Sequence, residues 1–366
     1  MRFSFRPLLE TTLILLVSLL WCEVGYYYYV FLYKCPGWPE PSSIEVEQRK
    51  FTRILVLADT HIMGPVKSVM IDKWRREWQM RQAFSISLRV YDPDVIIFMG
   101  DLFDEASFSW DKSFEEACND FERIFTIDRS SREVVVIPGN HDIGFHDHML
   151  YFPHLIDRFQ DRFKATTGAE LLSSVKIRSL NVVAINSMSF YNDSCPYCRE
   201  SRRAVNAISR YLNDQATLQG NKFVHPILLT HIPLYRLNDT QCEYPSHLER
   251  IVEKENLQGK DVLHDEISQF LLRKIQPRLI ISGHTHMKCK TNHLLAANDR
   301  HEFHEEITIS SYNHKYAEKK PGFLLLSASR TGTFATHCDL VEEWVIASIY
   351  IAAVVLICSR LIILKY

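Results

Sequence analysis

The sequence predicts an α/β layered domain carried between two apolar terminal segments. Short apolar, β-branched runs alternate with longer helical patterns through the middle of the chain, which is typical of α/β layering. Several of these runs are followed directly by aspartate, asparagine or histidine. Each terminal segment is long enough to cross a bilayer, which takes about 20 apolar residues.

Composition excludes some classes of protein. The chain has 366 residues, 46% hydrophobic and 23% charged, which are ordinary values for a folded protein and argue against disorder. Its net charge of −2 and the lack of a strongly basic block argue against a nucleic-acid partner. A single central domain of about 300 residues fits this length.

The first apolar segment, residues 11–33, predicts a membrane helix. Glu23 is its one charged residue, and Tyr26 to Tyr29 fit an interfacial aromatic belt. A cleaved signal peptide is the alternative, because Arg2 and Arg6 precede the apolar core. The apolar run continues past the tyrosines without a clear small-residue cleavage site, which favours an uncleaved helix.

The central region supplies the elements of the layered domain. The predicted strands are Ile54 to Ala58, Val95 to Met99, Val134 to Ile137, Val182 to Ile185, Ile227 to Leu229, Leu279 to Ile281, Ile307 to Ser311 and Phe323 to Ser327. The predicted helices are Val66 to Val90, Trp110 to Ile127, Arg199 to Leu218 and Val262 to Ile275. We place the domain at residues 51–335, with linkers at 34–50 and 336–343.

The last apolar segment, residues 344–364, predicts a second membrane helix, with a buried core helix as the alternative. Arg360 lies near enough to the terminus to reach the headgroups. Positive residues flank the outer ends of both segments, so residues 1–10 and 365–366 are predicted to be cytosolic tails. The domain is then lumenal, which agrees with the glycosylation sequons at Asn192 and Asn238.

The motif Cys195-Pro196-Tyr197-Cys198 allows three interpretations: a tight disulfide, a redox pair or half of a zinc site. The chain has no second CxxC motif, which argues against a structural zinc site. No βαβ pattern surrounds the motif, which argues against a thioredoxin-like role. A local disulfide is therefore predicted.

Metal-ligand residue types follow five of the predicted strands. Because sheets of this kind bind ligands at the carboxyl ends of their strands, these side chains should meet on one rim. The ligand candidates are Asp59, His61, Asp101, Asn140, His231, His284 and His286. Mixed oxygen and imidazole ligands suit manganese, iron and zinc alike, and one carboxylate could bridge two ions. Taken alone, His231 fits a hydrogen-bonded histidine at a strand end better than a ligand, and only the other motifs favour a ligand.

In their order, these motifs resemble the calcineurin-like metallophosphoesterase superfamily. The motifs are D-x-H, GD-x-x-D, GNH-D, H and GH-x-H, and the resemblance spans Ile54 to Met287. It implies an αββα sandwich of mixed sheets with two metal ions. One ion would be held by Asp59, His61, Asp101 and His286, and the other by Asp101, Asn140, His231 and His284, with Asp101 as the bridge.

The resemblance also implies a mechanism. A metal-bridging hydroxide would attack phosphorus in line, while both metals neutralise the phosphoryl oxygens. His141 would contact the phosphate and protonate the leaving oxygen. Asp104 would orient His141 by accepting its second ring proton, and Asp142 is the alternative for that role.

One departure from the superfamily bears on the substrate. Protein serine/threonine phosphatases of this superfamily carry an arginine where this chain has Glu105. The missing cation favours a phosphodiester, which has one negative charge, over a dianionic monoester. We also hypothesise that Glu105 contacts a cationic head group.

The two apolar segments narrow the resemblance to membrane-tethered members of the family. Residues 100–105 (GDLFDE), 139–144 (GNHDIG) and 230–236 (THIPLYR) carry it. It implies removal of a mannose-linked ethanolamine-phosphate from glycosylphosphatidylinositol (GPI) anchors, which supports remodelling and ER-to-Golgi transport of GPI-anchored proteins. It also implies manganese, with iron and zinc as alternatives, and cargo receptors as candidate partners.

The location implied is the membrane of ER exit sites, the ER–Golgi intermediate compartment and the cis-Golgi. The tail Leu364-Lys365-Tyr366 has one lysine, so it departs from the lysine-based retrieval signal expected there. Two alternatives stay open. One is a lumenal diesterase for another lipid or nucleotide head group. The other is a non-catalytic scaffold, although such proteins usually lack one of the ligands or the phosphate-contacting histidine.

Overall fold

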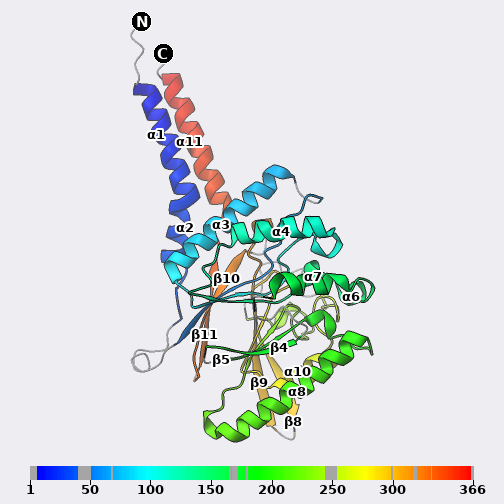
Figure 1. The fold of residues 1–366 in the computed structure, drawn as a ribbon. Coiled ribbons are helices and arrows are strands. Elements are labelled where there is room, and N and C mark those ends of the chain that lie inside the picture. Colours follow the sequence, from blue (N-terminus) through cyan, green and yellow to red (C-terminus); the bar gives the residue numbers. More distant parts are fainter. Residues whose placement is uncertain are drawn as a thin grey trace.

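The computed structural model places two apolar helices beside each other above an α/β domain (Figure 1). It describes residues 6–39, 51–66, 69–164, 166, 172–178, 180–243, 254–297, 300–315, 320–330 and 332–363. The predicted tail 365–366 lies outside the described residues, as do residues 1–5 of the other tail and 40–50 of the first linker.

The first sheet has five strands in the order β11-β10-β1-β2-β3. The strands are β1 (Thr52–Leu57), β2 (Val95–Phe98), β3 (Glu133–Val136), β10 (Gly322–Ala328) and β11 (Thr333–Asp339). β1, β2 and β3 are parallel, whereas β10 and β11 are antiparallel to their neighbours. Their residues are mainly β-branched or aliphatic, which suits strands covered on both faces.

The second sheet has six strands in the order β4-β5-β6-β7-β9-β8. The strands are β4 (Leu172–Ile177), β5 (Leu180–Ile185), β6 (Ile227–Thr230), β7 (Leu279–Ser282), β8 (Cys289–Ala297) and β9 (Arg300–Thr308). β5, β6, β7 and β9 are parallel, and the two hairpins at the edges are antiparallel. Both sheets are therefore mixed, as predicted.

Alternate strand residues face opposite sides and so define the layers. Ile54 and Val56 of β1 pack with Leu229 of β6 and Ile281 of β7 in the core between the sheets. The outer faces carry helices. α3 (Met70–Tyr91) and α4 (Asp111–Ile124) cover the first sheet, and α8 (Pro196–Gln219) and α10 (Asp265–Ile275) cover the second (Figure 1). This arrangement confirms the αββα sandwich.

Some predicted boundaries were wrong. The strand expected at Ile307 to Ser311 is the end of β9, which begins at Arg300 and ends at Thr308. The domain does not end at residue 335, because β11 continues to Asp339. Cys338 in β11 forms a disulfide with Cys35, which fixes the start of the first predicted linker to the sheet.

Three short helices escaped prediction because each is shorter than the pattern that identifies a helix. They are α5 (Asn140–Ile143), α6 (His146–Tyr151) and α7 (His154–Phe163). The helix predicted from Val66 begins instead at Met70.

Two further disulfides lie in the domain, Cys195–Cys198 and Cys242–Cys289. The first confirms the predicted local bridge and lies at the start of α8.

The terminal helices are long and apolar enough to cross a membrane, by length and composition. The first is continuous over Leu8–Lys34 and comprises α1 (Arg6–Leu20), α2 (Tyr26–Tyr29) and two π-helical segments, Trp21–Gly25 and Val30–Lys34. The second is α11 (Glu343–Ile363), which lies against α1 (Figure 1). The end of the first helix nearest the domain is buried against it. There the ring of Phe31 packs edge-on against the ring of Phe323 in β10, with 5.3 Å between the ring centroids.

A charged cluster joins the first terminal helix to α3. Both carboxylate oxygens of Glu23 accept hydrogen bonds from Arg75 at 2.9 and 2.7 Å. The Trp78 indole and the Tyr350 hydroxyl of α11 each donate to the same carboxylate at 2.7 Å. Glu23 thus links three helices that are far apart in sequence.

Arg75→Met should destabilise the protein by about 3 kcal/mol, because it leaves the buried Glu23 carboxylate without its cation. Thermal unfolding of the detergent-solubilised chain measures this. The matched control is the double variant Glu23→Gln, Arg75→Met, which removes both charges and should recover much of the loss. Equal melting temperatures for the single and double variants would show that the pair adds no stability.

Candidate metal centre

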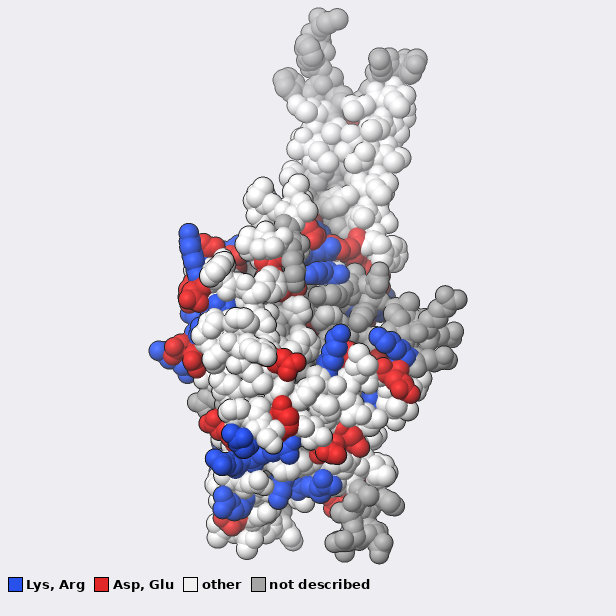
Figure 2. Space-filling view, turned by 90° about the vertical axis from the view of Figure 1, so that its right-hand side faces the viewer, with Lys and Arg blue, Asp and Glu red and all other residues white. Residues whose placement is uncertain are grey.

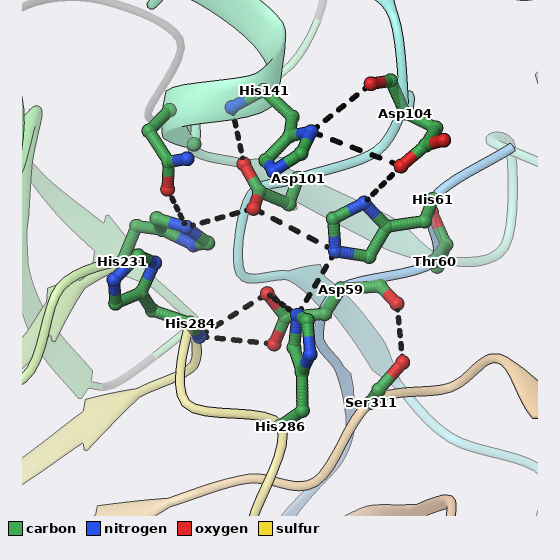
Figure 3. A network of polar contacts seen from close by, with 12 residues as sticks. Asp59, Thr60, His61, Asp101, Asp104, His141, His231, His284, His286 and Ser311 are labelled. Atoms are coloured by element: carbon green, nitrogen blue, oxygen red, sulfur yellow. Dashed lines mark hydrogen bonds and ion pairs between the residues drawn. The ribbon is translucent and has the colours of Figure 1, made fainter. Parts of the chain in front are cut away.

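The predicted ligands meet at one rim, at the carboxyl ends of strands from both sheets (Figure 3). Asp59 and His61 follow β1, Asp101 follows β2 and Asn140 follows β3. His231 follows β6, and His284 and His286 follow β7. The side chains of Asp59, His61, Asp101 and His231 are almost fully buried, so the ligands line a recess rather than a surface patch.

The backbone of the rim is strained. Five ligand candidates have a positive φ angle, a region in which residues with a Cβ atom are uncommon. They are Asp59, His61, Asp101, His284 and His286, with φ values of 53°, 41°, 49°, 69° and 59°. Such strain persists where the surroundings hold it, and it is frequent at functional sites.

Glycine is required where two ligand loops meet. A Cβ atom on Gly139 would lie 2.2 Å from the backbone nitrogen and from Oδ1 of Asp101. A Cβ on Gly100, at φ +89°, would lie 2.7 Å from Nδ1 of His231. The glycines before Asp101 and Asn140 therefore permit the close approach of the loops that carry these ligands.

One set of ligand atoms converges on a single point. Oxygen or ring nitrogen atoms of Asp59, His61, Asp101 and His286 all lie within 4.8 Å of one another. The Nε2 atoms of His61 and His286 are 3.0 Å apart, and Nε2 of His286 is 3.6 Å from Oδ1 of Asp59. These four residues are the set that the family resemblance assigns to the first metal.

The second set shares Asp101 with the first. Asp101, His231 and His284 also bring one ligand atom each within 4.8 Å of the others. Nε2 of His231 is 3.4 Å from Oδ2 of Asp101 and 3.2 Å from Oδ1 of Asn140. Asp101 thus lies between the two sets, the position that a bridging carboxylate requires.

Contacts outside the two sets orient the histidine rings. His231 donates from Nδ1 to the Met99 carbonyl at 2.7 Å, so its Nε2, which faces Asp101, is the ring nitrogen left for a metal. His284 donates from Nε2 to the Lys260 carbonyl at 2.7 Å. The other ring nitrogen of His284, Nδ1, is buried and has no hydrogen-bond partner among the described residues. A cation at this point would supply its missing partner.

The charges of the rim also fit cations. Burial raises the pKa of Asp59 well above its usual range, and the neighbouring Asp101 adds to the shift. Burial also acts to raise the pKa of Asp101, but His231 and His61 outweigh burial and lower this pKa well below its usual range. Burial acts to lower the pKa of His231, but the neighbouring Asp101 carboxylate raises the pKa of this histidine to about 9. Two buried carboxylates this close can both ionise only with positive charge between them. The buried acidic and histidine residues of the rim therefore fit the two divalent ions that the family resemblance implies.

His141 lies at the opening of the rim, with its side chain 32% exposed. Its backbone nitrogen donates to Oδ1 of Asp101 at 2.7 Å, and its Nδ1 is 3.0 Å from the carbonyl oxygen of Asp104. If Nδ1 donates to that carbonyl, Nε2 is left to contact a substrate. This position suits the predicted role of a proton donor to the leaving group.

The predicted role of the Asp104 carboxylate needs correction. Its Oδ1 is 3.8 Å from Nδ1 of His141 but 3.4 Å from Nδ1 of His61, and its Oδ2 accepts from Lys315 at 2.9 Å. The backbone carbonyl of Asp104 therefore orients His141, and its carboxylate orients the ligand candidate His61. The alternative, Asp142, accepts from the backbone nitrogens of Gly139 and Phe103 and supports the loops instead.

The position of Glu105 does not fit the hypothesis that it contacts a cationic head group. The residue is 4% exposed, and its Oε2 accepts a hydrogen bond from the backbone nitrogen of Val66 at 3.1 Å. Its carboxylate therefore joins two loops beside the rim rather than facing a substrate. Of the two sequon asparagines, Asn192 is exposed and Asn238 is partly exposed.

Sequence reasoning missed three residues that follow β9. The Ser311 hydroxyl donates to the Asp59 carbonyl at 2.7 Å (Figure 3). The Asn313 amide donates to the carbonyls of Thr60 and His61. Lys315 brings a cation to Asp104. These residues also follow a strand that runs parallel to β7, so the strand-end rule could have identified them.

Chelation of the metals should lower the melting temperature. Ions present at 100 times their dissociation constant would stabilise the folded chain by about 2.7 kcal/mol. Thermal unfolding with and without EDTA measures the effect, and readdition of a divalent ion should reverse it. An unchanged melting temperature, in a sample shown by elemental analysis to lose its metal, would contradict this expectation.

Comparison with known proteins identifies the family of the chain. Residues 52–288 match the family model described as calcineurin-like phosphoesterase, and the chain belongs to this family. With its paired metal-ligand sets, it is a metal-dependent phosphoesterase.

Among its relatives are vertebrate proteins named Metallophosphoesterase 1. The chain is 33% identical to the Mus musculus protein over 96% of this chain and 90% of that one. It is 35% identical to the Ailuropoda melanoleuca protein, with 97% and 89% covered, and 32% identical to the Danio rerio protein, with 92% and 86% covered. The similarity therefore extends into the terminal segments.

The fold is also similar to a solved structure of purple acid phosphatase PPD1 from yellow lupin (Lupinus luteus) seeds. The TM-score is 0.52 at 13% identity. The alignment covers 83% of this chain and 54% of the lupin protein, which is the larger of the two.

Proposed function

We propose that this chain is a membrane-anchored dimetal phosphodiesterase that removes a mannose-linked ethanolamine-phosphate from GPI anchors. The observation that carries the proposal is a complete double ligand set, sharing Asp101, in a domain whose two ends continue into adjacent apolar helices. A catalytic domain held to a bilayer at both ends meets substrates that are themselves held in that bilayer.

Charge at the rim supports a diester as the substrate. Two bound divalent ions would neutralise phosphoryl oxygens and supply the attacking hydroxide. Among the described residues, Lys315 brings its ammonium to the rim, and this charge is paired with Asp104 at 2.9 Å. A diester has one negative charge, so it needs less compensation than a monoester dianion.

The proposed location is the lumenal side of ER exit-site, ER–Golgi intermediate compartment and cis-Golgi membranes. Three disulfides in the central region support an oxidising compartment. GPI-anchored proteins would be the substrates, and cargo receptors of the early secretory pathway are candidate partners. Manganese is the proposed metal, since the mixed oxygen and imidazole ligands suit it, with iron and zinc as alternatives.

The decisive experiment compares GPI glycans in cells that lack the chain and cells that express it or its Asn140→Ala variant. The wild-type chain should lower the ethanolamine-phosphate content measured by mass spectrometry, and the variant should not. Unchanged glycans, together with hydrolysis of bis(p-nitrophenyl) phosphate by the purified chain, would reject this substrate and favour another lumenal diester. No hydrolysis of any diester would favour a scaffold.

A further inference from the structure

One face of the first part of α3 is apolar and open to solvent. Met70, Ile71, Trp74 and Trp78 are 62%, 74%, 61% and 41% exposed. Their spacing places them on one side of the helix, because residues four apart lie above one another. Val66 and Val69, just before the helix, are 78% and 72% exposed. We call these six residues the α3 apolar face.

The basic residues of the same helix segment contact other parts of the protein. Lys73 bonds Asp120 of α4 at 2.9 Å, Arg75 bonds Glu23, and Arg76 bonds Glu343 at 2.6 Å. In a helix on a water-soluble domain, charges normally face solvent and large apolar side chains face the core. Here basic side chains are paired with the protein while two tryptophans face outward, so this face is suited to an apolar environment.

Two contacts place α3 at the base of the terminal helices. Trp78 donates to Glu23 of the first terminal helix, and Arg76 bonds Glu343 at the first residue of α11. The 21 residues of α11 extend over about 31 Å at 1.5 Å each, close to the thickness of a hydrocarbon core. A bilayer crossed by α11 therefore begins near Glu343 and Trp344, at the level of the middle of α3.

The first turns of α3 rise from that level. Figure 1 shows that α3 begins on the side from which the terminal helices project, and that it descends toward its end below α2. Figure 2 faces the side where α3 begins and shows uncharged surface beside the base of the terminal helices. The α3 apolar face therefore meets the boundary that the terminal helices define.

We propose that the α3 apolar face inserts into the interfacial layer of the bilayer as a third membrane contact and orients the catalytic domain. This inference rests on the membrane anchoring proposed above. Tryptophan suits this layer because its ring is apolar while its N–H group is polar. Clustered valine, isoleucine and methionine side chains would add apolar area below the headgroups.

The proposed contact lies next to the metal rim. Val66 is only five residues beyond the ligand His61, and its backbone is bonded to Glu105 in the neighbouring rim loop. Five residues span at most about 18 Å, so an inserted Val66 keeps His61 within that distance of the membrane surface. The contact would thus hold the metal rim within reach of a phosphodiester on a lipid-linked glycan.

The membrane contact can be tested with the full chain in phosphatidylcholine vesicles whose acyl chains carry bromine, a quencher of tryptophan fluorescence. Trp74→Phe should remove part of the bromine-dependent quenching, because Trp74 would lie near the acyl chains. Leu218→Trp is the matched control, since Leu218 is 78% exposed near the end of α8 and far from the terminal helices. Its added fluorescence should not be quenched. An unchanged quenching signal in Trp74→Phe would overturn the proposal.

A functional comparison separates this inference from the proposed activity. The variant Ile71→Glu, Trp74→Glu should cleave a vesicle-held diester about tenfold more slowly, equivalent to about 1.4 kcal/mol. Its hydrolysis of bis(p-nitrophenyl) phosphate should stay at the wild-type rate, and Leu218→Glu should change neither rate. Equal rates on the vesicle-held diester would overturn the membrane contact alone. A wild-type chain with no diesterase activity would instead reject the proposed function, while the quenching result would still decide the contact.

Discussion

Asp101→Ala should reduce hydrolysis of every phosphodiester by about 10⁴-fold, equivalent to about 5.5 kcal/mol of transition-state stabilisation. Asp101 belongs to both ligand sets, and its Oδ1 also accepts from the backbone of His141. The variant therefore weakens both metal sites and frees the loop that carries His141. Measured kcat/KM and metal content, by elemental analysis, should fall together.

Asp142→Asn is the matched control for Asp101→Ala. Asp142 is also fully buried and lies in α5, but it bonds backbone nitrogens rather than belonging to a ligand set. Its loss should lower stability more than metal content. Full metal occupancy in Asp101→Ala would contradict the bridging position.

His141→Asn should lower kcat by about 10² to 10⁴, the contribution typical of a general acid, while both metals stay bound. The loss should depend on the leaving group. An alcohol such as the mannose hydroxyl needs a proton as it departs, whereas p-nitrophenolate leaves without one. We therefore expect a large loss on a glycan diester and a small one on bis(p-nitrophenyl) phosphate.

Asp104→Asn tests how His141 is oriented. Since the backbone carbonyl of Asp104 lies next to His141 while its carboxylate faces His61 and Lys315, this variant should weaken metal binding and keep the leaving-group dependence of the wild type. Equal losses on both substrates in His141→Asn would argue that His141 only binds the phosphate.

The rim could be predicted because its ligands obey a local rule, a polar residue directly after a buried strand. That rule brought together Asp59, Asp101 and His231 without knowledge of strand order. The role of Asp104 could not be predicted in the same way. Its position in the motif is fixed, but whether its carbonyl or its carboxylate faces His141 depends on the path of the loop.

Contacts of charged residues between distant elements also could not be predicted from the sequence. The motif pattern shows that Glu105 replaces an arginine, but not that its carboxylate bonds the backbone at Val66. Likewise, Glu23 in an apolar segment indicates a polar contact without naming Arg75 as its partner. Strand β11, which ends at Asp339, was not predicted, because its pairing with β10 rather than local composition defines it.

The disulfide between Cys35 and Cys338 closes almost the whole catalytic domain into a covalent ring, since 303 positions separate the two cysteines. Each end of that ring continues into its own apolar helix. A protease that cuts once inside the ring would leave both fragments joined and, if the helices cross a bilayer, both anchored. Release of a soluble catalytic domain from such a membrane would need two cuts, one on each side of the ring.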